Sequence, residues 1–285
     1  MKRFTFIVLT ASIIMFSCNG GKQSASTIED NSTDTIDSVS ICQTDSIIVE
    51  EYEEESDEPP MPKSADELFD DFFFNYVYSN KLQKSRTVFP LEVNEADSTF
   101  FISKADWVMD EFFTEQEYYT LIFDSEEQME IGKDTSVDSV VVEKIMLTDS
   151  IIRNYVFERK NGLWMLTAIN RTELSENANA AFLDFYKRFA SDTEFQNKSL
   201  CESVKFITTD TDDDFNTMEG VITSESWPAF APELPVDVIY NIIYSRTNPE
   251  SKQKIFLLRG ISNGLEVQLD FIFEQGRWKL AQLTT

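Results

Sequence analysis

The residues of this chain best suited to chemistry are one aspartate and two tyrosines in apolar segments. Asp270 lies in the middle of an alternating apolar segment, and Tyr240 and Tyr244 lie in a neighbouring segment. An enzyme that isomerises a small substrate needs a carboxylate base and an acidic hydrogen-bond donor, held in apolar surroundings that tune their pKa values. Asn154 occupies the place equivalent to Asp270 in an earlier segment. These side chains are therefore the candidates for a pocket.

A structural role is the plainer interpretation of the same residues. Strict alternation places Asp270 on the strand face opposite Leu269 and Phe271, and the sequence does not say which face is concave. Arg153 shares a face with Tyr155 and could bind an anionic ligand at a cavity mouth. A snorkelling arginine, with an apolar stem and a solvated head, is the alternative.

The composition narrows the classes of function. The 285 residues include no histidine, the commonest general base near neutral pH, so an enzyme would depend on carboxylates, tyrosine or lysine. The net charge of -27 repels nucleic acid, which is not expected as a partner. No catalytic or cofactor motif stands out, so we expect no cofactor.

One acidic segment resembles the start of a calcium loop. Asp210, Asp212 and Asp214 alternate as in an EF-hand, but Phe215 stands where that loop needs glycine and Val221 where it needs glutamate. An acidic hairpin tip explains the segment better, and no metal site is expected.

The three cysteines are too few for a disulfide scaffold. We expect Cys201 to be a small buried apolar residue, while a disulfide to Cys42 stays open.

The N-terminus carries an export signal. Met1-Lys2-Arg3 is basic, and the mostly apolar run over residues 4–16 is too short to span a bilayer. Met15-Phe16-Ser17-Cys18 resembles a bacterial lipobox, which implies that Cys18 receives a lipid that holds the chain on a membrane. An ordinary secretory signal is the alternative. Asn19 after the cysteine implies, by the sorting rule of model bacteria, an outer-membrane lipoprotein that faces the periplasm or the cell surface.

An acidic tether follows over residues 19–63. It is predicted to be disordered, because it cannot bury enough apolar surface to offset its conformational entropy. Three of its triplets resemble the Asp-Ser/Thr-aliphatic acceptor of the general O-glycosylation system of Bacteroidetes, which implies sugars on Thr35, Ser38 and Ser46. Chance in a segment rich in Asp, Ser and Thr is the alternative.

The rest of the chain repeats one pattern, which opens with an amphipathic helix. Ser64-Ala65-Asp66-Glu67 predicts a capping box at the start of the first helix. Aromatic residues with helical spacing match across the two copies at a constant offset of 113: Phe69 with Phe182, Phe72 with Phe185, and Tyr76 with Phe189.

Both copies end in a β-hairpin. Strands over residues 155–158 and 163–166 flank Asn161-Gly162, and strands over 271–274 and 277–280 flank Gln275-Gly276. Such turn pairs supply the positive φ angles of two-residue turns. Earlier strands are predicted over residues 140–147, 238–244 and 254–259. Helices followed by an antiparallel meander indicate an α+β fold.

The matched aromatic helices and the Gly-x-Trp hairpins (Gly162-Leu163-Trp164 and Gly276-Arg277-Trp278) resemble the nuclear-transport-factor-two-like superfamily. This cystatin-like cone fold is shared with ketosteroid isomerases. The resemblance covers about residues 64–285 and implies two tandem cone-shaped domains, over 64–172 and 175–285, each with N-terminal helices packed on a curved antiparallel sheet. Together with the lipobox and tether, the twin cones resemble an uncharacterised lipoprotein family of Bacteroidetes.

The resemblance carries no function, because this fold hosts enzymes, binders and scaffolds alike. Twenty-four phenylalanines against eight glycines predict cones filled by aromatic side chains. We therefore expect a non-enzymatic, envelope-anchored binding or scaffold lipoprotein that recognises a protein or a glycan. The alternative is a small-molecule-binding or isomerase- or hydrolase-like protein that uses a carboxylate and tyrosine in a cone pocket.

Overall fold

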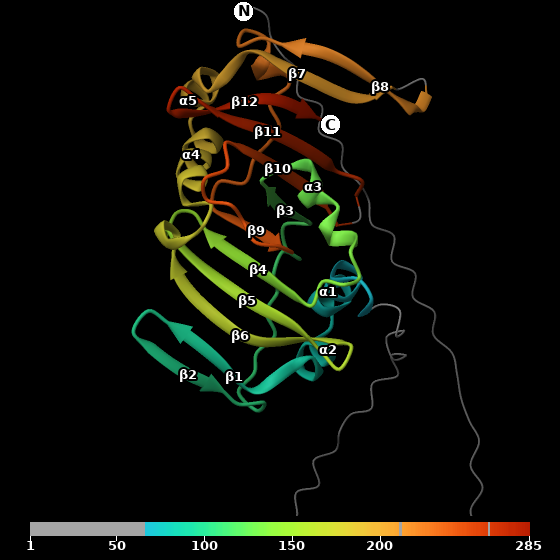
Figure 1. The fold of residues 1–285 in the computed structure, drawn as a ribbon, viewed down its shortest axis with the longest axis vertical. Coiled ribbons are helices and arrows are strands. Elements are labelled where there is room, and N and C mark those ends of the chain that lie inside the picture. Colours follow the sequence, from blue (N-terminus) through green and yellow to red (C-terminus); the bar gives the residue numbers. More distant parts are fainter. Residues whose placement is uncertain (1–65, 211–212, 262) are drawn as a thin grey trace, which may run out of the picture. The chain divides into compact units, whose positions relative to one another are not determined.

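The computed structural model of the chain describes residues 66–210, 213–261 and 263–285 (Figure 1). The predicted signal peptide and the whole predicted tether lie outside these residues, and so do Cys18, Thr35, Ser38, Ser46 and Ser64. Within the described part, no helix is long and apolar enough to cross a membrane.

The first half of the described chain folds as three α-helices, one 3-10 helix and six strands. In chain order they are α1 (Phe69–Tyr78), α2 (Asn80–Ser85), β1 (Thr87–Glu95), β2 (Ser98–Ile102), β3 (Tyr118–Phe123), α3 (Glu126–Met129), η2 (Ile131–Lys133), β4 (Ser139–Met146), β5 (Ile151–Lys160) and β6 (Leu163–Glu173). The predicted hairpin at Asn161-Gly162 is confirmed, and both turn residues have positive φ angles.

The second half repeats the order of two α-helices followed by six strands. It comprises η3 (Leu174–Glu176), α4 (Ala180–Ser191), α5 (Thr193–Lys198), β7 (Leu200–Asp210), β8 (Asp213–Ile222), η4 (Trp227–Ala229), β9 (Val238–Ile243), β10 (Gln253–Gly260), β11 (Glu266–Glu274) and β12 (Arg277–Thr284). The fold is thus a mixture of helices and strands with few helices and one large sheet, as the α+β interpretation requires (Figure 1).

All twelve strands form one sheet, in the order β2-β1-β6-β5-β4-β9-β3-β10-β11-β12-β7-β8. Each strand of the first half has a counterpart in the second half whose number is higher by six, so β1 corresponds to β7 and β2 to β8. When counterparts are treated as the same strand, the order is palindromic. The third strands are exchanged: β9 of the second half pairs with β4, and β3 of the first half pairs with β10. The predicted division into separate cones near residue 172 is therefore not confirmed, because hydrogen bonds between the halves run through the middle of the sheet.

Two aromatic cores cover the central strands, one on each face. Alternate residues of β3 belong to different cores, with Leu121 in the first and Ile122 in the second. We call the side of the first core, which contains α1, the α1 face, and the side of the second core, which contains α4, the α4 face. Burial on both faces explains why β3, β9 and β10 are nearly continuous apolar runs instead of alternating ones.

Matching contacts recur in the two halves. The Trp164 ring packs edge-on against Phe69 at a centroid distance of 5.1 Å, and Trp278 packs in the same way against Phe182 at 5.4 Å. Gln83 and Gln196, which lie at the same offset as the helix aromatics, are both buried and hydrogen-bonded.

Aromatic rings fill both interiors. Phe112 and Phe113, from the segment between β2 and β3, pack against Phe73 at centroid distances of 5.1 and 5.6 Å. In the second half, the indole of Trp227 is buried and donates a hydrogen bond to Gln196 (2.9 Å). These rings belong to the two cores.

The start of α1 differs from the predicted capping box. The helix begins at Phe69 and its first turn receives no side-chain cap. Asp66 instead forms a two-pronged ion pair with Arg86, at 2.7 and 2.9 Å. This charge-assisted, two-pronged pair is stronger than a single neutral cap bond.

Candidate functional site

Two of the proposed pocket residues, Arg153 and Tyr240, lie on the α1 face. Lys144 is the register partner of both, and its ammonium lies 5.5 Å from the centre of the Tyr240 ring. Tyr155, also on this face, donates a hydrogen bond to Asp110. Burial raises the pKa values of Tyr155 and Tyr240, so neither phenol is a strong acid.

Tyr244 and Asp270 occupy separate places on the same face. Tyr244 donates a hydrogen bond to Asp70 of α1, and burial raises the pKa of both groups. Asp270 accepts a hydrogen bond from Gln268 (2.9 Å), and burial raises its pKa. Leu269 belongs to the second core, so Asp270 points away from that interior. Within the described residues, no hydrogen bond joins Asp270 to either tyrosine, and a base-and-acid pair is not assembled.

Asn154 points to the α4 face, where it belongs to a row of polar residues that runs across seven strands. Consecutive members are register partners on neighbouring strands. The members of this polar row, from the β2 edge to the middle of the sheet, are Thr99, Asn94, Asn170, Asn154, Glu143, Asn241 and Thr120.

Hydrogen bonds fix the outer members of the polar row. The Thr99 hydroxyl donates to the side-chain oxygen Oδ1 of Asn94 (2.7 Å), and the Asn94 side-chain nitrogen Nδ2 donates to Oδ1 of Asn170 (3.0 Å). Asn154 donates to Thr172 of β6 at 3.2 Å. The amides are therefore oriented before any ligand arrives, while each keeps donors or acceptors for other partners.

Glu143 closes the inner end of the accessible row. Its side chain is buried, and its two oxygens accept hydrogen bonds from Asn177 (2.6 Å) and Asn241 (2.7 Å). Burial raises the pKa of Glu143, although these two amide bonds favour the carboxylate. A buried carboxyl with a raised pKa beside a hollow is a feature of functional sites.

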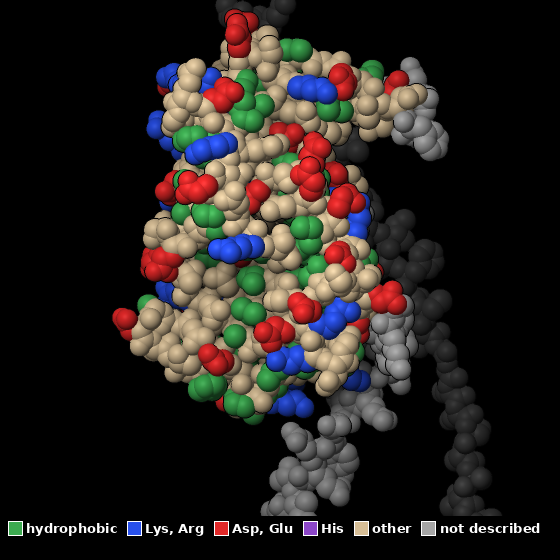
Figure 2. Space-filling model, viewed as in Figure 1, with side chains coloured by type: hydrophobic (Ala, Val, Ile, Leu, Met, Phe, Trp, Pro, Cys, Tyr) green, Lys and Arg blue, Asp and Glu red, His purple; other side chains and the backbone are tan. Residues whose placement is uncertain are grey.

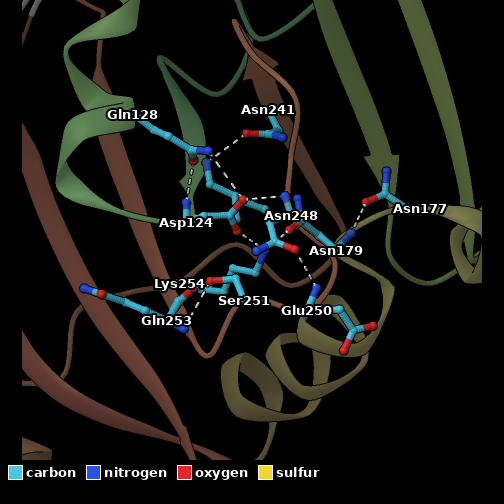
Figure 3. A network of polar contacts seen from close by, with 11 residues as sticks. Asp124, Gln128, Asn177, Asn179, Asn241, Asn248, Glu250, Ser251, Gln253 and Lys254 are labelled. Atoms are coloured by element: carbon cyan, nitrogen blue, oxygen red, sulfur yellow. Dashed lines mark hydrogen bonds and ion pairs between the residues drawn. The ribbon is translucent and has the colours of Figure 1, made fainter.

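A second buried polar cluster adjoins this end (Figure 3). Lys254 of β10 pairs with Asp124 at the end of β3 and donates to Asn179 (2.5 Å); its side chain is 2% exposed. Asp124 also accepts a hydrogen bond from the backbone of Asn248 (2.6 Å). The cluster ties the exchanged strand β3 to α4 and to the loop before β10.

Two joined hollows lie along the polar row. One, of about 890 Å³, is lined by the β1–β2 turn and the end of β6, and the other, of about 530 Å³, by β4, β5 and the segment 245–249. They share Asn170, Thr172 and Glu176, and we call the combined hollow the trough. Their volumes are those of ligand sites, and neither hollow is lined by the rings that fill the interiors.

The sequence reasoning found Asn154 but missed its partners in the row. Glu143 and Asn241 are polar residues inside otherwise apolar strands, and that interruption was the available signal. Asn94 and Asn170 carry no such signal, because they lie near the ends of their strands.

The structure also bears on the acidic segment around Asp210 and on the cysteines. The hairpin of β7 and β8 is confirmed, but Asp212 and the side chains of Asp214 and Phe215 lie outside the described residues. Cys201 is half-buried in β7 instead of fully buried, and Cys42 is not among the described residues.

Comparison of this chain with known proteins identifies the family to which it belongs. A crystal structure of an NTF2-like protein from Bacteroides fragilis NCTC 9343 is 40% identical to this chain, with a TM-score of 0.73; the match covers 79% of this chain and 98% of that one. No curated protein matches the chain. Residues 48–285 match the family model described as a domain of unknown function, DUF4348. The chain therefore belongs to the DUF4348 family.

Proposed function

We propose that this protein is a non-enzymatic binding protein of the cell envelope and that the trough is its recognition site. The observation that carries the proposal is the polar row. Five of its seven members line the trough, and their amides and hydroxyls are held in place by hydrogen bonds to one another or to Thr172. Polar groups fixed in advance bind a ligand without the entropic cost of ordering them.

The filled interiors favour this function over a cone-pocket enzyme. Phe112 and Phe113 occupy the first interior and Trp227 the second. The carboxylate and the tyrosines suited to isomerase chemistry are separated, with Asp270 bonded to Gln268 and Tyr244 to Asp70. A ligand therefore meets the outside of the sheet and not a cavity inside it.

The envelope anchor belongs to the same proposal. The lipobox-like Met15-Phe16-Ser17-Cys18 and the acidic tether support a lipid on Cys18, with the folded part held away from an outer membrane. Replacing Cys18 with serine should move the protein from the detergent phase to the aqueous phase when cells are extracted with a phase-separating detergent. Unchanged partition of C18S would remove the anchor from the proposal.

We further propose that the folded part consists of two interleaved cones. The support is the palindromic strand order, the repeated tryptophan contacts and the family likeness to an NTF2-like protein. In this arrangement each cone borrows its third strand from the other half, so the halves act as one rigid unit.

The trough is tested with the full chain against a panel of soluble oligosaccharides and short peptides, by calorimetry. At least one panel member should bind, and N154A together with N170A should weaken that binding. Q268A is the matched control. Gln268 pairs with Thr284 as Asn154 pairs with Asn170, at a constant offset of 114, so the register makes Gln268, and not Asp270, the equivalent of Asn154. Binding that these variants leave unchanged, or turnover of a panel member, would overturn the proposal.

A further inference from the structure

We propose that the ligand of the trough is an extended, uncharged oligosaccharide that lies across the strands with its rings along the polar row. This inference rests on the proposed function and names the chemical class of its ligand. Spacing, hydrogen-bonding capacity, charge and one exposed aromatic ring support it.

The spacing of the polar row fits sugar rings. Asn94, Asn170 and Asn154 are register partners on three adjacent strands, so their backbones are spaced by roughly 4.8 Å. A pyranose ring with its linking oxygen is about as long as this spacing. An extended peptide advances by roughly 3.3 Å per residue, so its amides would fall out of step with the row.

The side chains of the row also offer the right hydrogen bonds. A sugar hydroxyl both donates and accepts, and a primary amide has two donors and one acceptor oxygen within one plane. Asn154 uses one amide hydrogen on Thr172, and Asn170 uses its oxygen to accept from Asn94. The remaining hydrogen-bond donors and acceptors of Asn154 and Asn170 can bind neighbouring hydroxyls of one sugar ring.

The charge of the trough excludes acidic sugars. Glutamates and aspartate outnumber the basic residues around it: Glu95, Asp97, Glu143, Glu173 and Glu176 against Arg171 and Arg246. Arg171 is moreover paired with Glu95 at 3.8 Å. On the side of the molecule that Figure 2 shows, acidic and basic side chains are interspersed without a basic field that could hold a polyanion.

An exposed ring lies beside the outer end of the row. Phe101 is two residues beyond Thr99 in the edge strand β2, so it points to the same face, and it is 60% exposed. The apolar C–H face of a sugar ring can stack on such a ring, which would widen the binding surface along β2 beside Thr99.

The test uses calorimetry on the full chain with three probes, the β-1,4-linked tetramers of glucose, N-acetylglucosamine and mannose. At least one should bind. N154A should weaken that binding about tenfold, the loss of roughly one net hydrogen bond to a ligand. F101A should weaken it about fivefold through the lost stacking. The control Q268A should stay within about twofold, since its site lies on the other half.

The outcomes separate the two proposals. A fourth probe, the acidic tetramer of galacturonate, tests the charge argument and should bind more weakly than the best neutral tetramer. Equal or tighter binding of this acidic tetramer, or no binding of any of the three neutral probes, would overturn the oligosaccharide inference. If instead a peptide from the panel binds and N154A weakens it, the trough remains the recognition site and only its ligand class is wrong. If ligands bind but N154A and F101A leave their affinity unchanged, both proposals fail.

Discussion

The buried ion pair between Lys254 and Asp124 offers a sharp test of how the exchanged strands are held. The Lys254 side chain is 2% exposed and that of Asp124 is 9% exposed, and the pair joins β10 to the end of β3. Replacing Lys254 with methionine keeps the aliphatic stem and removes the charge. Asp124 is then buried without its cation, which in other proteins costs about 3–5 kcal/mol.

The assay is equilibrium unfolding of the full chain in urea, followed by tryptophan fluorescence and circular dichroism. We expect K254M to lower the free energy of unfolding by about 3–5 kcal/mol. For a folded part of this size, each 1 kcal/mol lowers the melting temperature by roughly 2–4 °C. K198M is the matched control: the pair of Lys198 with Glu194 is 71% and 80% exposed, so its loss should cost less than about 1 kcal/mol. A K254M protein as stable as K198M would refute the reasoning.

Two further predictions concern the carboxyl of Glu143 and the exchanged strands. Burial raises the pKa of folded Glu143 above its ordinary 4.5, so its contribution to stability is complete below that pH and is lost as the pH rises through the folded pKa. The free energy of unfolding of the wild type minus that of E143Q should therefore fall between pH 4 and pH 8 in urea titrations, and a pH-independent difference would contradict the burial argument. Co-expressed fragments 1–177 and 178–285 should co-purify as one complex, because β9 completes the sheet beside β4 and β3 beside β10; two fragments that each elute as a folded monomer would show that the exchange is not needed.

Local patterns predicted the local structure well. The aromatic spacing of Phe69, Phe72 and Tyr76 predicted the buried face of α1, and all three side chains are at most 3% exposed. The residue pair Gln275-Gly276 predicts a two-residue turn, because glycine readily adopts the positive φ angle that such a turn needs. Gly276 has a φ of 78° in the structure.

The sheet order could not be predicted in the same way. The strand β3 is a continuous apolar run, Tyr118–Phe123, without the alternation that marks a face, and it was not predicted as a strand. Because β3 and β9 are both buried on two faces, nothing in their sequences distinguishes pairing within a half from pairing between halves. The exchange depends on contacts far apart in the chain, such as that of Lys254 with Asp124.

The candidate site was predicted only in part, for the same reason. The sequence pattern predicts Asn154 as the counterpart of Asp270, and the structure shows that this prediction is wrong. Asn154 pairs with Asn170 and Gln268 pairs with Thr284 at the same offset of 114, so the counterpart of Asn154 is Gln268. The polar row exists because registers on seven strands align, and a register is a property of pairs of strands and not of one segment.

A crystal structure of the full chain with the tightest-binding β-1,4-linked tetramer would test the trough most directly. We expect sugar rings over Asn94, Asn170 and Asn154, with one ring stacked on Phe101. Sugar bound on the α1 face, or among the rings around Phe113, would contradict the account.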